Sequence, residues 1–430
     1  MSIKKESAMR EGKNTALLVP RLRFPEFLNA EEWSAPKLAD ISTSVVERVG
    51  VRSLIPVSIS AGIGFVPQAE KFGRDISGNQ YRLYTVVRDG DFVYNKGNSL
   101  KFPQGCIYDL QNWGEVAAPN VFICFRLNAG YENGFFRQCF EQNAHGLQLK
   151  KHITSGARSN GLLNISRDAF FGVKIPTPQH AEQQKIADCL SSLDELITAE
   201  SQKLGALKTR KKGLMQQLFP LDGETVPRLR FPEFNNAGEW SAQTIGNMFL
   251  LTNGCAFKPE DWKSTGTPII RIQNLNDRSA GFNYSQAPVP ERNRIETGDL
   301  LFAWSGTLGS SFGARVWNGP PGVLNQHIFK VQMDEQQITL PFSLLVLARV
   351  EEDIARKSHG FKASFVHVKK SDLVKIDLLL PSVPEQQRIA SCLSSLDAII
   401  NAQTQKIDAL KAHKMGLMQQ LFPVINEVQE

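Results

Sequence analysis

Nine consecutive residues occur twice in this chain, and this repeat limits the possible folds more than any other feature. The stretch VPRLRFPEF spans residues 19–27 and returns letter for letter at 226–234, which is 207 positions later (226 − 19). Both copies continue as N-A-x-E-W and reach a tryptophan, Trp33 or Trp240. Self-similarity at a fixed separation is the mark of duplicated structural units, so the sequence predicts two related halves.

A second repeat closes each half. PTPQHAEQQKIADCLSSLDELITAESQKLGALKTRKKGLMQQLFP occupies 176–220, and PSVPEQQRIASCLSSLDAIINAQTQKIDALKAHKMGLMQQLFP occupies 381–423. From Glu182 and Glu385 onward the two copies align without a gap. We therefore divide the chain into an N-terminal tail (1–18), a first domain (19–178), a first helical repeat (179–220), a second domain (221–380), a second helical repeat (381–423) and a C-terminal tail (424–430).

The long repeats have the apolar spacing of a coiled coil. Apolar residues recur in alternating steps of three and four, which is the pattern that places a narrow stripe against a partner helix. The predicted seam consists of Ile186, Leu190, Leu193, Ile197, Leu204, Leu207, Leu214, Ile389, Leu393, Leu396, Ile400, Ile407, Leu410 and Leu417. Polar residues interrupt it at Glu200, Lys211, Gln403 and Lys414. Two such helices can bury each other's stripe, or each can pack separately on its own domain.

The regions between the repeats favour β-structure. YRLYTVV, FVYN, NVFICFRL, TPIIRI, DLLFAW and HIFKV are short β-branched or aromatic runs, and Gly, Pro, Asn and Asp separate them. Gly90-Asp91 and Gly298-Asp299 each precede an apolar run nearly in phase with the opening repeat. The predicted fold class is α+β: two β-rich domains that share one diverged fold, separated by two long helices.

Composition narrows the function classes without choosing one. The formal net charge of +6 is compatible with a nucleic-acid partner but is common among soluble proteins. The six cysteines form no C-x-x-C pair and no Cys/His ligand spacing, so we predict no metal site and a reduced, cytoplasmic setting. The N-terminus lacks the apolar core of a signal peptide, and no apolar run is long enough to span a membrane.

Sequence signatures of catalysis are missing. The chain has no G-x-x-x-x-G-K-[ST] loop for ATP, and Ala61-Gly62-Ile63-Gly64 is interpreted as a turn between strands. Asn318-Gly319-Pro320-Pro321 lacks the register and the aromatic residue of an adenine methyltransferase loop. The histidines lie in no hydrolase or metalloprotease motif. We therefore predict that the chain is not an enzyme.

The duplicated layout resembles the specificity subunit of type I restriction-modification systems. The residues that carry this resemblance are E-Q-Q-x-I-A-x-C-L-S-S-L-D at the start of each helical repeat and G-L-M-Q-Q-L-F-P at its end. It covers nearly the whole chain, from Val19 to Pro423, although the variable regions match only in outline.

The resemblance implies a DNA reader without catalysis of its own. Each variable region would be a target-recognition domain for one half of a split double-stranded DNA target, and the helices would pair antiparallel as a spacer that fixes the gap. The helical repeats would dock two methyltransferase (modification) subunits, and restriction/translocase subunits would join them. S-adenosylmethionine, ATP and Mg would be bound by those partners, so this chain is expected to bind no cofactor.

Candidate DNA-contacting residues are polar side chains near predicted loops and strand ends, since such groups read base edges and phosphates. In the first domain they are Asn95, Lys96, Asn98, Lys101, Lys150, Lys151 and Arg158. In the second domain they are Lys258, Arg271, Gln273, Asn274, Trp304, Ser305, Asn325 and Gln326. For each of them a solvated surface role is the competing interpretation.

The two arginines of VPRLRFPEF are interpreted differently. Two domains that read unlike sequences should differ where they touch bases, whereas an identical element should serve something that both halves share. We therefore predict that the repeat joins helix to domain or docks a common partner. The competing hypothesis for the whole chain is a non-catalytic coiled-coil scaffold whose β-rich domains bind proteins.

Overall fold

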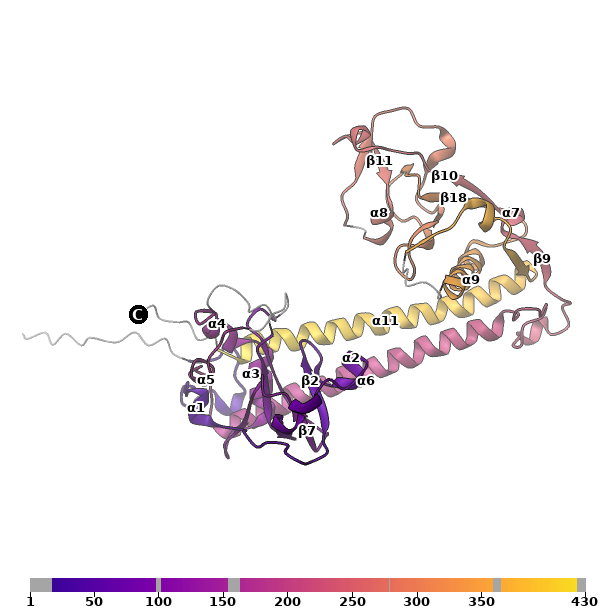
Figure 1. Cartoon of the computed structure of the whole chain (residues 1–430). Coiled ribbons are helices and arrows are strands. Elements are labelled where there is room, and N and C mark those ends of the chain that lie inside the picture. Colours follow the sequence, from indigo (N-terminus) through magenta and orange to yellow (C-terminus); the bar gives the residue numbers. More distant parts are fainter. Residues whose placement is uncertain (1–17, 98–101, 154–162, 278, 359–364, 424–430) are drawn as a thin grey trace, which may run out of the picture. The chain divides into compact units, whose positions relative to one another are not determined.

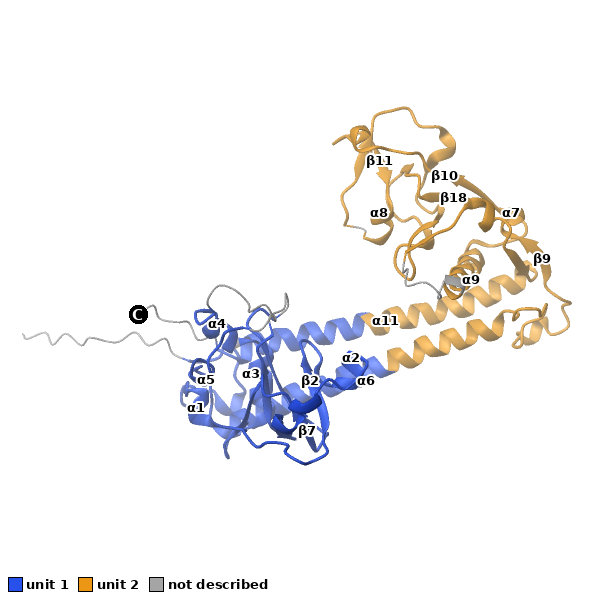
Figure 2. Ribbon diagram, viewed as in Figure 1, with its two compact units in different colours: residues 1–202, 405–430 blue, residues 203–404 orange. Residues whose placement is uncertain are grey.

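The structure is a computed structural model that describes residues 18–97, 102–153, 163–277, 279–358 and 365–423. It contains two compact units, shown in Figure 2: unit 1 comprises 1–202 and 405–430, and unit 2 comprises 203–404. Two helices of 39 residues, α6 (His180–Leu218) and α11 (Val383–Leu421), each contribute one half to each unit. A unit is therefore one variable region together with half of each helix.

Unit 1 contains two four-stranded sheets. The first has the order β1-β8-β5-β6 and is antiparallel throughout, and the second has the order β3-β2-β7-β4 with β2 and β7 parallel. The strands are β1 (Ser42–Ser44), β2 (Ile55–Ser60), β3 (Gly64–Pro67), β4 (Thr85–Arg88), β5 (Phe92–Asn95), β6 (Cys106–Asp109), β7 (Glu115–Ala118) and β8 (Ile123–Leu127). The helices are η1 (Pro25–Phe27), α1 (Leu38–Ile41), α2 (Gln68–Phe72), η2 (Gly78–Leu83), α3 (Asn133–Glu141), α4 (Ala144–Lys150) and α5 (Arg167–Phe171), and Figure 1 labels most of them.

Unit 2 repeats this topology. Its four-stranded sheets have the orders β10-β18-β14-β16 and β12-β11-β17-β13, again with one parallel pair, β11 and β17, and it adds the two-stranded sheets β15-β19 and β20-β9. The strands are β9 (Ser241–Thr244), β10 (Phe249–Asn253), β11 (Thr267–Ile270), β12 (Asn283–Ser285), β13 (Arg294–Ile295), β14 (Leu300–Ala303), β15 (Ser305–Thr307), β16 (Gly313–Val316), β17 (Gly322–Leu324), β18 (Ile328–Met333), β19 (Phe365–His367) and β20 (Asp377–Leu380). The helices are η3 (Pro232–Phe234), α7 (Ile245–Met248), η4 (Pro259–Asp261), α8 (Ile272–Asn276), η5 (Glu291–Asn293), α9 (Leu340–Ser358) and α10 (Lys370–Leu373). The prediction of one diverged fold is confirmed.

The Gly-Asp pairs mark the same turn in both units. Gly90 has φ 90° and Gly298 has φ 99°, a left-handed conformation that costs glycine little. The Asp91 carboxylate accepts the Arg88 amide at 2.8 Å, and the Asp299 carboxylate accepts the Glu296 amide at 2.8 Å. In each unit this turn leads into a buried central strand, β5 or β14.

Three predicted strand runs are only partly correct. In NVFICFRL the strand begins at Ile123. In YRLYTVV the first three residues lie in the 3₁₀-helix η2, and the strand begins at Thr85. In TPIIRI the strand ends at Ile270 and α8 begins at Ile272, because the Asn274 side chain accepts the Arg271 amide at 3.0 Å and caps the helix. The turn predicted at Gly62 is confirmed, since it joins β2 to β3.

In both units the predicted seam of the helices is apolar and shielded from solvent. None of the fourteen seam residues is exposed, whereas Leu196 and Ile399, which lie outside the seam, are exposed. The first turns pack on the domain: Ile186 and Leu190 belong to the core of unit 1, and Ile389 belongs to that of unit 2. Both predicted packing arrangements therefore occur along each helix: its first turns pack on the domain, and the rest of the seam faces the other helix.

The polar residues that interrupt the seam pair across it. In unit 1, Lys414 Nζ lies 2.8 Å from Asp194 Oδ1. In unit 2, the equivalent Lys211 Nζ lies 2.6 Å from Asp397 Oδ1. Lys406 of unit 1 also pairs with Glu200. Because residues later in one helix meet residues earlier in the other, the helical segments run antiparallel.

The VPRLRFPEF repeat clamps two helix ends in each unit. The guanidinium of Arg23 donates to both Glu182 oxygens at 2.8 and 2.7 Å, and Arg230 donates to Glu385 at the same two distances. These carboxylate side chains are only 1% exposed. One residue earlier, the Leu22 amide donates to the Gln420 carbonyl at 3.0 Å. The repeat thus holds the start of one helix beside the end of the other, and Leu229 and Gln217 repeat this contact in unit 2 at 2.9 Å.

Aromatic packing completes each clamp. In unit 1, Phe422 at the end of α11 lies 6.2 Å from Trp33 and 5.2 Å from Phe135 between ring centroids. In unit 2, Phe219 at the end of α6 lies 5.7 Å from Trp240 and 5.5 Å from Phe342. The repeated tryptophan and the Leu-Phe-Pro ending therefore serve one structural purpose, which explains why both recur.

Candidate DNA interface

Unit 2 brings several predicted DNA contacts around one small cavity. Arg271, Gln273 and Asn325 line a cavity of about 280 Å³ together with His327. The parallel pairing of β11 with β17 causes this convergence: Arg271 and Gln273 follow β11, and Asn325 follows β17 at the same end of the sheet. Side chains that converge at the carboxyl ends of parallel strands are a common arrangement for ligand sites.

Arg271 is held in place by neutral groups. Its guanidinium carbon lies 4.5 Å from the centroid of the Trp262 ring, and its Nη1 donates to Asn283 Oδ1 at 2.9 Å. Among the described residues Arg271 forms no ion pair. An arginine that is oriented but not paired with a carboxylate is suited to a bidentate contact with guanine or phosphate oxygens.

An aromatic group adjoins this cavity. The Trp304 ring lies 5.3 Å from His327 and 4.6 Å from His367 between centroids. The Nε1 of Trp304 and the Nδ1 of His327 are buried without a hydrogen-bond partner. Burial and repulsion from His367 both lower the pKa of His327, which favours a neutral ring that can donate and accept one hydrogen bond each.

The other predicted contacts of the second domain have local roles or lie apart. Asn274 is buried, because its side chain caps α8 and donates to the Ala280 carbonyl at 3.1 Å. Ser305 is buried in β15, which pairs with β19. Gln326 is exposed beside His327, with 3.2 Å between the amide and the ring, and Lys258 is exposed before η4.

The first domain gathers its predicted contacts less well. Asn95 ends β5, and its amide is used locally: Nδ2 donates to the Ile59 carbonyl at 2.8 Å and Oδ1 accepts the Gly97 amide at 2.7 Å. Lys96 is half-buried, and Lys150 and Lys151 are exposed at the end of α4. Lys151 lines a cavity of about 380 Å³ that includes no other described candidate. The remaining candidates, Asn98, Lys101 and Arg158, lie outside the described residues.

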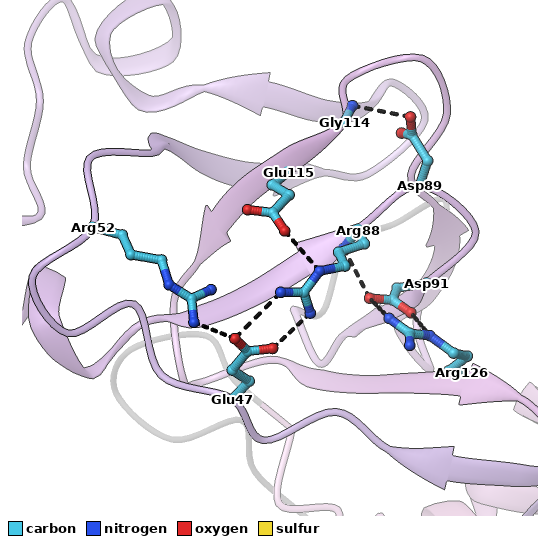
Figure 3. Close-up of polar contacts among 8 residues, drawn as sticks. All are labelled: Glu47, Arg52, Arg88, Asp89, Asp91, Gly114, Glu115 and Arg126. Atoms are coloured by element: carbon cyan, nitrogen blue, oxygen red, sulfur yellow. Dashed lines mark hydrogen bonds and ion pairs between the residues drawn. The ribbon is translucent and has the colours of Figure 1, made fainter.

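Three arginines of unit 1, Arg52, Arg88 and Arg126, are paired with carboxylates (Figure 3). Arg88 donates to Glu47 at 2.6 and 3.2 Å and to Glu115 at 2.7 Å, and Arg52 also binds Glu47. These hydrogen bonds lower the pKa of Glu47 to about 2. In Figure 3, Arg126 points at the buried Asp91 and donates to it at 2.6 and 3.0 Å. These cations are compensated, unlike Arg271 in unit 2.

Sequence reasoning missed a second cavity of unit 1, which is larger than the one beside Lys151. It measures about 600 Å³ and includes Tyr108, Asn143 and His145 among its walls. These residues come from β6, the start of α4 and the residue before it. No short motif connects them, so only the folded chain shows that they share a wall.

Among the residues that the structure describes, no group of three or more His, Cys, Asp or Glu side chains could hold a metal ion. No helix in the described part of the chain has the length and apolar character needed to cross a bilayer.

Comparisons with known proteins agree with these features. The family described as the type I restriction modification DNA specificity domain matches residues 120–209 and 237–412. The specificity subunit of type I restriction enzyme MjaVIII from Methanocaldococcus jannaschii is 23% identical over 296 residues, which cover 65% of this chain and 68% of that protein. The EcoBI specificity subunit from Escherichia coli is 25% identical over 173 residues, which cover 40% of this chain and 35% of that protein.

Solved structures share the fold over most of the chain. The type I restriction-modification S subunit from M. genitalium has a TM-score of 0.55 and 15% identity, covering 95% of this chain and 100% of that one. A chain from a structural study of complex assembly and conformational transition in a type I R-M system also has a TM-score of 0.55, with 17% identity, and covers 91% of this chain and 97% of that one. The family match spans more than half of the residues, and the chain therefore belongs to the type I restriction-modification DNA specificity family.

Proposed function

We propose that this chain is the non-catalytic specificity subunit of a type I restriction-modification system and that each of its domains recognises one half of a split DNA target. The family match supports DNA target recognition. Two units with one topology but unlike cavity walls support the division into two half-sites of different sequence. The scaffold hypothesis is not favoured.

The observation that carries this proposal is the Arg271 cavity. An oriented arginine without an ion pair among the described residues lies beside two amide side chains, Gln273 and Asn325. Arginine pairs with guanine and amides pair with adenine at the edge of the major groove, so this combination can distinguish bases. We propose that it reads the second half-site, with Gln326 and His327 at its margin.

The helices are proposed to set the gap between the half-sites. Each has 39 residues, or about 58 Å at ~1.5 Å per residue, without a proline after the first turn. A continuous helix maintains a fixed length, unlike a flexible linker. Lengthening both helices by up to one heptad should change the gap and leave the half-sites unchanged.

Other subunits would supply the chemistry. We propose that two methyltransferase subunits dock on the two copies of the helical repeat, and that restriction/translocase subunits join this complex in the cytoplasm. S-adenosylmethionine, ATP and Mg would then be bound by those partners.

The test is Arg271→Ala in the complex with the cognate methylating subunit. Loss of a bidentate base contact should weaken binding to the target duplex about 5- to 150-fold, equivalent to roughly 1–3 kcal/mol, and relax specificity at one base pair of the second half-site. Binding is measured by fluorescence anisotropy on duplexes with single base-pair changes. The matched control is Arg356→Ala, which removes an exposed arginine paired with Asp353 on α9.

Two results would contradict the proposal. Unchanged specificity at every position of the second half-site in Arg271→Ala removes this cavity from base recognition. A complex whose DNA affinity does not fall steeply with salt is no reader of DNA, since phosphate contacts release counterions.

A further inference from the structure

The 600 Å³ cavity of unit 1 is lined by none of the residues that form the VPRLRFPEF contacts or the ion pairs of Figure 3. Its volume is in the range of small-molecule sites, which are commonly lined by rings with a few polar groups. Its walls come from the β2–β3 turn, β6, α3 and the first residues of α4. The ring side chains in these walls are Phe65, Phe102, Tyr108, Trp113, Phe140 and His145.

His145, one of the residues that line this cavity, has unused hydrogen-bonding groups. The residue is 1% exposed, and neither ring nitrogen has a hydrogen-bond partner. Burial lowers the pKa of His145 to about 3, so the ring is neutral near pH 7. A neutral imidazole has one N–H donor and one nitrogen acceptor, and burying both without partners costs free energy unless a ligand satisfies them.

Asn143 adds a third unused atom. Its Oδ1 is buried without a partner, while its Nδ2 donates to Gln104 Oε1 at 3.2 Å. The backbone at Asn143 is left-handed, with φ 58°, which is uncommon for residues other than glycine. One donor and two acceptors without partners therefore belong to two lining residues that lie two positions apart in the chain.

The charged residues of the lining are already neutralised. Arg137 donates to both oxygens of Asp109 at 2.7–3.0 Å, and Glu141 lies 3.1 Å from Lys414 Nζ. These three residues, Arg137, Asp109 and Glu141, are the charged members of the described lining. A phosphate or carboxylate ligand would find no unpaired cation among them, so the cavity is suited to a neutral ligand.

We propose that this cavity binds a neutral nucleobase, held between rings and read at its edge by His145 and Asn143. A nucleobase is flat and aromatic and carries both donors and acceptors, which matches each property of the wall. The cavity is lined in part by Phe102 and Gly105, which precede β6. This segment contacts β5, because Tyr94 Oη donates to the Gln104 carbonyl at 2.7 Å. The next residue of β5 is Asn95, a predicted DNA contact. Resting on the proposed function, we assign the base to the first half-site, unstacked from the duplex.

The first test uses nucleosides as probes. Adenosine, guanosine, cytidine and thymidine are titrated singly, by calorimetry, into the full chain in complex with its methylating subunit, with inorganic phosphate as a negative control. One or more nucleosides should bind, and His145→Phe should weaken that binding at least tenfold because it removes both nitrogens but keeps a ring. The matched control is His152→Phe, at an exposed histidine of the same segment that does not line this cavity.

A second variant distinguishes the loss of a ligand contact from misfolding. Asn143→Gly removes Oδ1 and tolerates the left-handed backbone, so it should weaken nucleoside binding while the melting temperature changes little. His145→Phe should melt no lower than the parent chain, since it removes an unsatisfied polar ring. A purely structural histidine would instead lower the melting temperature and leave nucleoside binding intact.

The second test distinguishes a base of the DNA target from a free nucleoside as the ligand of the cavity. A mismatch opposite an unstacked base reduces the energy needed to extrude it, so a mismatch at that one position should tighten DNA binding, while mismatches elsewhere weaken it. His145→Phe should abolish the tightening. Nucleoside binding without any mismatch effect assigns the cavity to a free nucleoside instead.

The inference is overturned if no nucleoside binds, or if both cavity variants bind nucleosides like the parent chain. In that case intact recognition of a split target by the same complex leaves the proposed function standing. Loss of all specific DNA binding by the parent complex would contradict the proposed function instead.

Discussion

The two units share a scaffold and differ where each one forms a cavity. In both, an arginine of the VPRLRFPEF repeat binds a buried glutamate, and a tryptophan packs on the phenylalanine that ends the other helix. They differ after the strand that pairs in parallel with β7 or β17. In unit 1 the chain continues as the β2–β3 hairpin, whereas in unit 2 it turns into α8 at Arg271.

This difference separates what is common from what is specific. Both strands begin alike: β2 pairs in parallel with β7 and places Val57 in a hydrophobic core, and β11 pairs in parallel with β17 and places Ile270 in one. The next residues are Ser58 and Arg271, and from there the local structures diverge. A duplicated protein that binds two unlike DNA half-sites needs this combination: the same contacts between helix and domain in both units, and different cavity walls.

The largest effect is expected at the clamps. Arg23→Met leaves the Glu182 carboxylate buried and unpaired, and Arg230→Met does the same to Glu385, so each should lower the free energy of unfolding of its unit by about 3–5 kcal/mol. Hydrogen exchange measured unit by unit reports both losses. The exposed neighbours provide controls, since Arg21→Met and Arg228→Met should stay within about 0.5 kcal/mol. Strongly unequal losses would show that the two joints are not equivalent.

A smaller effect is expected on acidification, and it should be larger in unit 1. The pKa of His145 is depressed to about 3, so between pH 6.5 and 3 the unfolded chain binds a proton that the folded unit does not. The free energy of unfolding of unit 1 is therefore highest above pH 6.5 and decreases as the pH drops, with a loss of about 2 kcal/mol at pH 5. His327 is only half-buried, so unit 2 should respond less. Hydrogen exchange in unit 1 at pH 7 and 5 measures the loss, and an unaltered pH slope in His145→Phe would refute this assignment.

The smallest difference is expected between the seam lysines. The side chain of Lys414 is 10% exposed and contacts two carboxylates, whereas that of Lys211 is 25% exposed and contacts one. Lys414→Met should destabilise unit 1 by about 1.5 kcal/mol, and Lys211→Met should destabilise unit 2 by about 0.5 kcal/mol. Urea denaturation followed by hydrogen exchange measures both. Equal losses would mean that Glu141 adds nothing to the pairing of Lys414.

The two long helices and their contacts with each domain were largely predictable from the sequence, because they depend on repeated motifs and on a short spacing of apolar residues. The step of three and four residues identified the seam, and the Leu-Phe-Pro endings located the helix ends. The helical repeats, set at 179–220 and 381–423, enclose α6 and α11. The joint function of the arginines followed from their identity in both halves.

The cavity walls proposed to recognise DNA were only partly predictable because they form from residues distant in sequence. Arg271 and Asn325 were found as polar residues next to strand-like runs, but their meeting depends on the parallel pairing of β11 and β17. Asn274 shows the opposite error, since its polar side chain is used to cap α8. His145 carried no signal, because a lone histidine acquires its unsatisfied burial only in the folded unit.

The most direct test of the whole account is the map of methylated adenines in cells that co-express this chain with its cognate methylating subunit. We predict one split motif with two unlike halves and a fixed gap. Exchanging residues 40–170 for the corresponding region of another family member should replace one half of that motif and preserve the other half. Formation of the complex without new methylation, or a change in both halves after the exchange, would contradict the account.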